Sequence, residues 1–121
     1  MTKDIFVNTL INDDRINLFY KDNIQDNGEL LFHLFLADLA RFVTSDSDMI
    51  FAVIEKGLVS GDEELRGDIA VSFIENIVNR IENLSDKGIS QVAYQFSKSM
   101  QTETKNLFYD ILQKDGHKIE D

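Results

Sequence analysis

The stretch SGDEELRGDIAVSFIENIVNRIENL, residues 60–84, constrains the fold of this chain more than any other. Its apolar residues recur at helical spacing for about six turns, so one side of the predicted helix is apolar along its length. Such a helix has to bury that side against other elements. The chain contains no proline, which permits long helices and disfavours a loop-rich β fold. The apolar positions are Leu65, Ile69, Phe73, Ile74, Ile77, Ile81 and Leu84.

The first third of the chain predicts a short helix, a turn and a longer buried helix. Residues 3–12 carry apolar side chains at helical spacing, and Asp13 can cap a short turn after them. The polar segment 21–29 is typical of a loop. Asn27 can then cap a helix that continues to about Thr44 and is apolar nearly all round, as expected of a central helix.

The middle of the chain predicts a helical hairpin. A capping box at Ser45 begins a helix over residues 46–56, and Gly57 can end it in the left-handed conformation. A second capping box at Ser60 begins the long helix. Gly67 lies inside that helix, where glycine costs about 1 kcal/mol relative to alanine. A close approach of a neighbouring helix is the expected compensation.

The C-terminal part predicts two more helices. The sequence SDKGIS interrupts the chain after the long helix. Residues 89–100 have the spacing of a helix, although alternation around Val92 would also suit a strand. A last helix begins near Thr102 and stops at Gly116, and residues 116–121 are expected to fray.

We therefore predict an all-α fold. The chain has 121 residues, enough for one domain, and shows no internal repeat or linker. Residues 1–121 are expected to form a single-domain helical bundle of about five to seven helices.

Composition excludes several classes of function. The formal net charge is −10, and the 12 basic residues are scattered among 22 acidic ones without forming a basic stripe, which argues against nucleic-acid binding. The most apolar run, residues 30–43, is too short and too interrupted by polar residues to span a bilayer. The absence of cysteine excludes disulfides and thiolate metal sites and fits a reducing cytoplasm. A surface of this charge attracts basic partners.

No constellation of catalytic residues is recognisable in the sequence. His33 and His117 are 84 positions apart, and His33, among leucines and phenylalanines, is expected to be a core histidine. The sequence lacks H-E-x-x-H, E-x-x-H, glycine-rich phosphate-binding motifs and G-x-S-x-G. Acidic residues spaced along a solvated helix face lack the raised pKa of a general acid. We therefore expect no enzymatic activity, no cofactor and no metal.

The long helix also predicts a ridge of carboxylates opposite its apolar side. On a wheel of about 100° per residue, the ridge consists of Glu64, Asp68, Glu75 and Glu82, which fall on one line roughly 27 Å long. Like charges one turn apart cost a few tenths of a kcal/mol, which a cationic partner would relieve. The ridge is either a solvated face or a template for a basic surface, and a half-exposed tyrosine nearby could add an apolar anchor. The candidate partner-binding residues are Asp62, Glu63, Glu64, Asp68, Glu75, Glu82 and Tyr94.

Part of the chain resembles a known family. The helix start Gly61-Asp62-Glu63-Glu64, an aliphatic run and then Phe73-Ile74-Glu75-Asn76 form one pattern, and FSKSMQTETKNLFYDIL comes after it. Over residues 55–112 this pattern resembles immunity proteins of bacterial contact-dependent growth inhibition and related polymorphic toxin systems. The resemblance carries no residue-level binding motif.

The resemblance implies a cytoplasmic protein of a bacterium that binds a cognate toxin protein and blocks its active site. Many such toxins are nucleases with a basic surface, and a ribonuclease is the expected target. We expect the chain to act as a monomer, without nucleic acid or membrane. The main alternative is a helical adaptor or secretion chaperone that binds a protein segment through an apolar groove. A small metal protein and a mimic of nucleic-acid charge are weaker alternatives, and the latter would need more than 22 acidic residues in 121.

Overall fold

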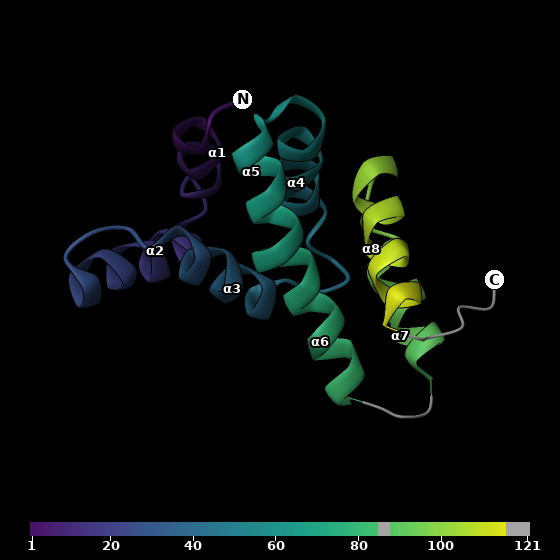
Figure 1. The fold of residues 1–121 in the computed structure, drawn as a ribbon. Coiled ribbons are helices and arrows are strands. Elements are labelled where there is room, and N and C mark those ends of the chain that lie inside the picture. The colour runs from purple at the N-terminus through teal and green to yellow at the C-terminus, as the bar shows by residue number, and fades with distance from the viewer. Residues whose placement is uncertain (85–87, 116–121) are drawn as a thin grey trace.

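The computed structural model describes residues 1–84 and 88–115, and these are almost entirely helical. Because α5, η1 and α6 continue one another as a single long helix (Figure 1), the described residues form seven helices and no strand. The predicted all-α fold of five to seven helices is confirmed. The predicted helix stop at Gly116, the predicted fraying of residues 116–121 and the first half of the predicted SDKGIS break, residues 85–87, lie outside the described residues. The elements are α1 (Lys3–Leu10), α2 (Asp14–Asn27), α3 (Phe32–Phe42), α4 (Asp48–Ser60), α5 (Glu63–Asp68), η1 (Ile69–Ile74), α6 (Glu75–Leu84), α7 (Ile89–Ser97) and α8 (Thr102–Lys114).

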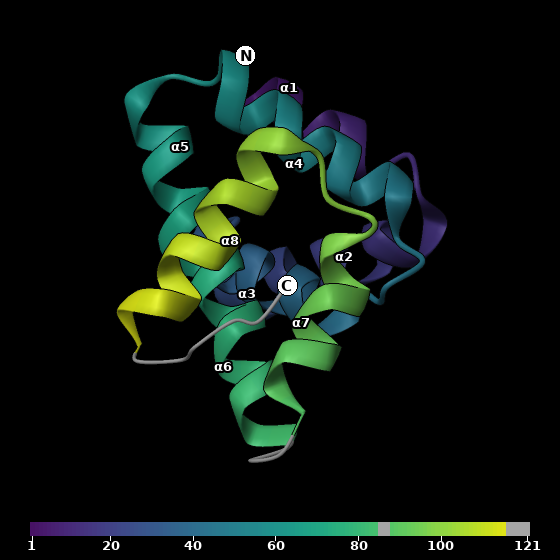
Figure 2. The ribbon, with the colours of Figure 1, turned by 90° about the vertical axis from the view of Figure 1, so that its right-hand side faces the viewer.

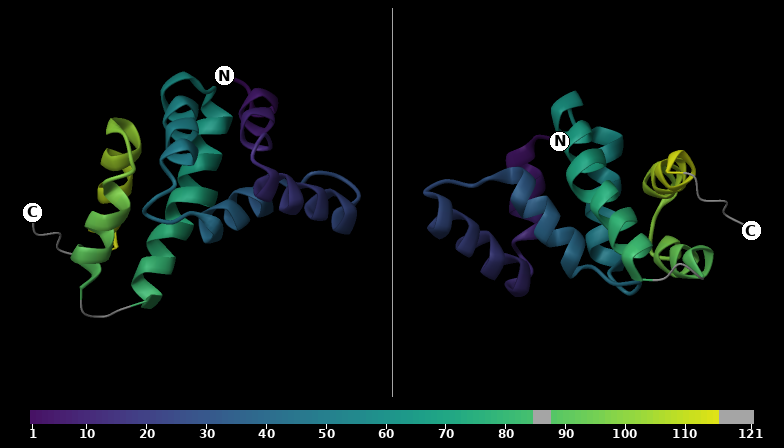
Figure 3. Two further views of the ribbon diagram at one scale, coloured as in Figure 1. Left: turned by 180° about the vertical axis from the view of Figure 1, so that it is seen from behind. Right: turned by 60° about the horizontal axis from the view of Figure 1, so that its bottom comes forward.

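The long helix is the centre of the structure. Its η1 segment packs against α3, α4 and α8, and α1 packs against α4. Seen from the side of the C-terminal helices, α8 crosses in front of the long helix while α7 lies beside α6 (Figure 2). Helices α2 and α3 lie side by side across the long helix from α7 and α8 (Figure 3). The buried side chains form one hydrophobic cluster that includes Phe6, Ile16, Phe35, Phe51, Phe73, Ala93 and Phe108.

Helix α2 is longer than the sequence suggested. The loop predicted over 21–29 is wrong, because α2 continues to Asn27 and ends at Gly28, which has a left-handed backbone (φ 78°). Asn27 is therefore the last residue of α2 and not a cap, and the next helix begins only at Phe32. The predicted end of that helix near Thr44 is close to the observed end at Phe42.

A buried asparagine closes the turn between α2 and α3. The Nδ2 group of Asn23 donates to the carbonyl oxygen of Leu31 at 3.0 Å, and the Leu31 backbone N–H donates to Asn23 Oδ1 at 2.9 Å. Asn23 is 6% exposed, so leaving these groups without partners would be costly. The polar residue that made this segment resemble a loop is thus the one that fixes the turn.

Three of the predicted helix boundaries around α4 also differ from the structure. Gly57 does not end the helix, which continues to Ser60. The residue that caps α5 is Asp62, whose side chain accepts a hydrogen bond from the Leu65 backbone N–H at 2.8 Å, so the capping box predicted at Ser60 does not form. At the start of α4, Ser47 takes the cap position predicted for Ser45.

The close approach predicted at Gly67 occurs instead at Gly57. A Cβ atom added at Gly57 would lie 2.6 Å from Ile69 Cδ1 and 3.1 Å from the Phe6 ring, both of which are fully buried. At Gly67, which is exposed, an added Cβ atom would meet nothing within 4 Å. The glycine at position 57 therefore allows α1, α4 and η1 to approach closely.

Substituting alanine for these two glycines should change stability in opposite directions. Gly67→Ala should raise the free energy of unfolding by about 1 kcal/mol, because alanine favours the helix and nothing obstructs its methyl group. Gly57→Ala gains the same preference but overpacks the core, which costs about 1–3 kcal/mol, so a net loss is expected. Urea unfolding of the two variants measures both values. A stabilised Gly57→Ala variant would contradict the packing described at this position.

The predictions for the C-terminal helices are confirmed. Residues predicted to be either helix or strand form the helix α7, which buries Ala93 and Phe96. The last helix, α8, begins at Thr102 and buries Phe108 and Leu112, as expected from their spacing.

Candidate functional site

The predicted acidic ridge is divided by a change of helical pitch. Residues Ile69–Ile74 form the π-helical segment η1 in the middle of the long helix. A π-helix bonds each residue to the fifth one along the chain, and the residue it adds per turn rotates the remainder of the helix by about 100° relative to a uniform α-helix. Glu75 and Glu82 therefore do not continue the line of Glu64 and Asp68.

Contacts with α3 agree with this rotation. On a uniform wheel, Asp68 and Arg80 would point about 120° apart. Both nevertheless contact α3 or the residue directly after it. Asp68 Oδ1 lies 3.6 Å from His33 Nε2, and Arg80 Nη1 donates to the carbonyl oxygens of Ala40 and Val43 at 2.9 and 2.6 Å. The straight ridge predicted from a uniform helix is therefore wrong.

The seven predicted partner-binding residues lie in three places. Asp62, Glu63 and Glu64 are exposed together at the start of α5, and Asp68 is half-buried at its end. Glu82 is half-buried in α6. Glu75 is exposed at the start of α6. Tyr94, in α7, is 56% exposed, and the Lys98 ammonium lies 4.8 Å from the centre of its ring. The structure does not gather these residues into one surface, and their role in binding stays a prediction.

His33 is not the core histidine expected from its neighbours. Its side chain is 67% exposed, and its Nδ1 atom lies 2.6 Å from Ser72 Oγ. Ser72, His33 and Asp68 are the three residue types that form the catalytic triad of serine hydrolases. Ser72 is only 7% exposed, however, so its hydroxyl is not presented to a substrate. We assign these three residues to holding α3 against the long helix.

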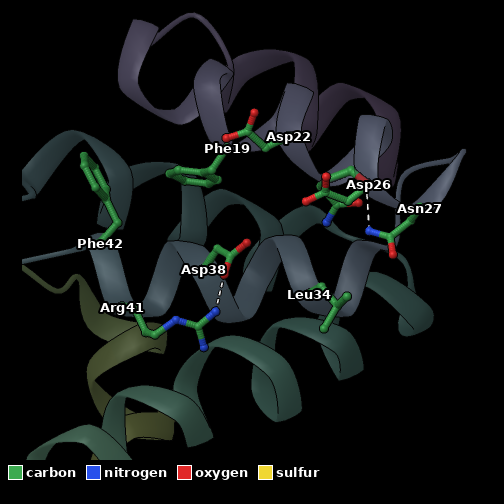
Figure 4. Close-up of a pocket in the computed structure, with 9 residues that line it drawn as sticks. Phe19, Asp22, Asp26, Asn27, Leu34, Asp38, Arg41 and Phe42 are labelled. Atoms are coloured by element: carbon green, nitrogen blue, oxygen red, sulfur yellow. Dashed lines mark hydrogen bonds and ion pairs between the residues drawn. The ribbon is translucent and has the colours of Figure 1, made fainter.

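A groove lies between α2 and α3, which the sequence did not indicate. It has a volume of about 610 Å³, and Figure 4 shows its walls. Phe19, Asp22 and Asp26 come from α2, while Leu34, Asp38 and Arg41 come from α3. The remaining lining residues are Asn23, Asn27 and Phe42.

The groove is acidic. Arg41 is the one basic residue among those that line it, and its guanidinium donates to the Asp38 carboxylate on the same helix. Asp22 and Asp26 are exposed, and neither carboxylate forms a hydrogen bond or ion pair with a residue in the described part of the chain. Four residues apart on α2, these two carboxylates repel each other by a few tenths of a kcal/mol.

Arg15 of α2 pairs with Asp13 and with no carboxylate of the groove. Its guanidinium donates to Asp13 at 3.1 Å and lies 4.9 Å from the centre of the Phe42 ring. The hydrogen bond from Arg15 lowers the pKa of the Asp13 carboxyl, which also caps α2 by accepting from the backbone N–H groups of Arg15 and Ile16. Arg15 therefore stabilises the start of α2 and does not pair with Asp22 or Asp26.

The groove has fixed walls. The Phe19 ring packs against Phe35 and Phe42 with centroid separations of 5.6 and 5.8 Å. At the other end, Asn27 Nδ2 donates to the Asn23 carbonyl oxygen at 2.8 Å, and Asn23 holds the turn that leads to α3. A partner would therefore meet a surface that is already formed.

The groove could not be found from the sequence once residues 21–29 were interpreted as a loop. Asp22 and Asp26 were consequently not placed on one helix face. The signal that could have identified them is the continuing helical spacing of Ile16, Tyr20 and Ile24.

The described residues contain neither a metal site nor a membrane-spanning helix. No group of three or more histidine, aspartate or glutamate side chains among them could hold a metal ion. Within the same part of the chain, no helix is both long and apolar enough to cross a bilayer. Comparison of the chain with protein-family models, curated proteins and solved structures gives no match.

Proposed function

We propose that this chain is an immunity protein of the bacterial cytoplasm, which binds a basic toxin domain and blocks its active site without performing chemistry. The observation that carries the proposal is the presence of exposed carboxylates without partners on preformed helices. Asp22 and Asp26 occupy α2, and Glu63 and Glu64 occupy the first turn of α5. The resemblance of residues 55–112 to immunity proteins supports the same function.

The electrostatics of such an inhibitor are favourable. A net charge of −10 attracts a basic protein over distances comparable with the Debye length, about 8 Å at physiological salt. Nucleases that bind phosphate groups are basic, so a ribonuclease toxin is the target that we propose first. Because the helices are already folded, little conformational entropy is lost on binding.

A helical adaptor or secretion chaperone is the second candidate function. Exposed apolar side chains favour it, namely Leu34 at 50% and Met49 at 84%. An adaptor of this kind would bind an apolar segment, and its affinity would depend little on salt. Salt dependence therefore distinguishes the two functions.

An immunity protein should be encoded beside a large exoprotein, and the C-terminal domain of such a neighbour is the test partner. Produced alone, that domain should stop growth and cleave RNA. An equimolar amount of this chain should abolish cleavage, and the association rate should fall about tenfold or more between low and high salt. An unrelated basic ribonuclease is the control for charge alone and should keep its activity. Continued cleavage in a stoichiometric mixture would contradict inhibition, and binding without inhibition would favour the adaptor.

A further inference from the structure

The groove between α2 and α3 has the shape that accepts a third helix. Both of its walls are helices, and half-buried Phe19 and Phe42 line it together with Leu34, whose side chain is 50% exposed (Figure 4). An amphipathic helix binds such a groove by laying its apolar side between the two walls. The apolar side chains of the groove would provide the desolvated contacts that charge alone does not supply.

The charges of the groove specify a basic occupant. Asp22 and Asp26 lie one helical turn apart, a rise of roughly 6 Å along α2. Asp38 lies on the opposite wall, next to Arg41. Lysine or arginine side chains four residues apart on a bound helix would match the spacing of Asp22 and Asp26.

Two other occupants fit less well. A metal ion is disfavoured because the groove carboxylates are not among any described group of three acidic or histidine side chains that could hold one. A second copy of this chain would bring another net charge of −10 to a surface that is already acidic. A basic helical segment meets neither difficulty.

We infer that the α2–α3 groove is the docking site for a basic, amphipathic helical segment of the partner protein. This inference rests on the proposed function in one respect: that function identifies the partner protein as the toxin domain. The groove itself forms the direct contact with the helical segment of the partner. The carboxylates at the start of α5, Glu63 and Glu64, lie outside the groove and contribute only to long-range attraction.

A designed peptide tests the inference directly. The probe is a fluorescein-labelled peptide of about 16 residues made of leucine, lysine and alanine, with leucines on one helical face and lysines beside them. Its binding to the full chain is measured by fluorescence anisotropy. The double variant Asp22→Asn/Asp26→Asn should weaken binding about tenfold, equivalent to about 1.4 kcal/mol. Leu34→Ser, which removes an apolar contact, should weaken it as well.

The matched control removes the same amount of charge elsewhere. Glu63→Gln/Glu64→Gln also deletes two exposed carboxylates and should change the affinity less than about twofold. Asp22, Asp26, Glu63 and Glu64 are all exposed, so circular dichroism should show unchanged helix content in both double variants. A peptide of the same composition with a scrambled order, which is not amphipathic, should bind much more weakly.

Several outcomes would overturn the inference. Equal weakening by the two double variants would show attraction by overall charge, and weakening by the α5 variant alone would place the site on the long helix. Equal binding of the scrambled peptide, or no binding of the probe to the unmodified chain, would also exclude a helix-binding groove. The toxin-inhibition assay is independent of all these results, so the proposed function could stand while the groove is excluded.

Discussion

Replacing Glu55 by alanine is expected to lower the free energy of unfolding by about 3 kcal/mol, the largest effect of any single substitution considered. Glu55 lies in α4, is 9% exposed and reaches the start of α8. Its Oε1 atom accepts from the backbone N–H and the hydroxyl of Thr104, at 2.8 and 2.9 Å. Its Oε2 atom accepts from the Glu103 backbone N–H at 3.1 Å.

This carboxylate replaces the missing local cap of α8. The residue at the cap position, Gln101, makes no side-chain hydrogen bond to the helix. A helix start carries unpaired N–H groups and a partial positive charge, and a carboxylate satisfies both. Removing Glu55 would leave Thr104, which is fully buried, without its partners.

Urea unfolding of three variants measures the effect of Glu55. Glu55→Gln keeps the shape but places an amide NH₂ group among donors, so an intermediate loss is expected. Glu75→Ala removes an exposed glutamate and should change stability by less than about 0.5 kcal/mol. Equal stability of the Glu55→Ala and Glu75→Ala variants would show that Glu55 does not cap α8.

The second large effect is expected at Arg80, where replacement by alanine should cost about 2–3 kcal/mol of stability. Arg80 donates to the carbonyl oxygens of Ala40 and Val43, at the end of α3. Its guanidinium also lies 5.4 Å from the centre of the Phe96 ring in α7. One side chain of α6 therefore connects three helices.

Two further variants separate the roles of this arginine. Arg80→Lys keeps the charge but loses the planar fork, so an intermediate loss is expected. Arg66→Ala removes an exposed arginine from α5 and should be nearly neutral, because Arg66 has no side-chain partner in the described part of the chain. Hydrogen exchange at the end of α3 should accelerate in Arg80→Ala. An Arg80→Ala variant as stable as Arg66→Ala would contradict this role.

The all-α fold could be predicted because its evidence is local. The spacing of Leu65, Ile69 and Phe73, and of Phe108 and Leu112, is visible in the sequence, and each of these side chains is buried. The absence of proline removed the main obstacle to long helices. Burial of the apolar side of each helix then determines the packing in broad terms.

The features that could not be predicted depend on distant residues. Glu55 caps a helix 48 positions away, and Gly57 is required only because Ile69 and Phe6 approach it. Neither requirement leaves a mark in the neighbouring sequence. The same holds for Asn23, which the sequence placed in a loop and whose partner, Leu31, was expected inside the following helix.

The sequence predicted that the candidate site would be acidic and helical, but it did not predict which helices would form it. Acidic residues on helices were expected, and exposed carboxylates do occupy α2 and α5. The wheel used to align Glu64 and Glu75 assumed a uniform helix, and the π-helical segment between them removes that alignment. A π-helical segment depends on how neighbouring helices pack, and the sequence period alone does not reveal it.

The most direct test is the amide NMR spectrum of this chain, recorded free and with an equimolar amount of the toxin domain proposed as its partner. If acidic side chains of the α2–α3 groove form the contact, the largest shifts should map to residues 14–27 and 32–42. Asp22→Asn/Asp26→Asn should reduce those shifts, and added salt should weaken the complex. Shifts confined to α7 and α8, with an affinity independent of salt, would contradict the claim that this chain acts as an acidic inhibitor.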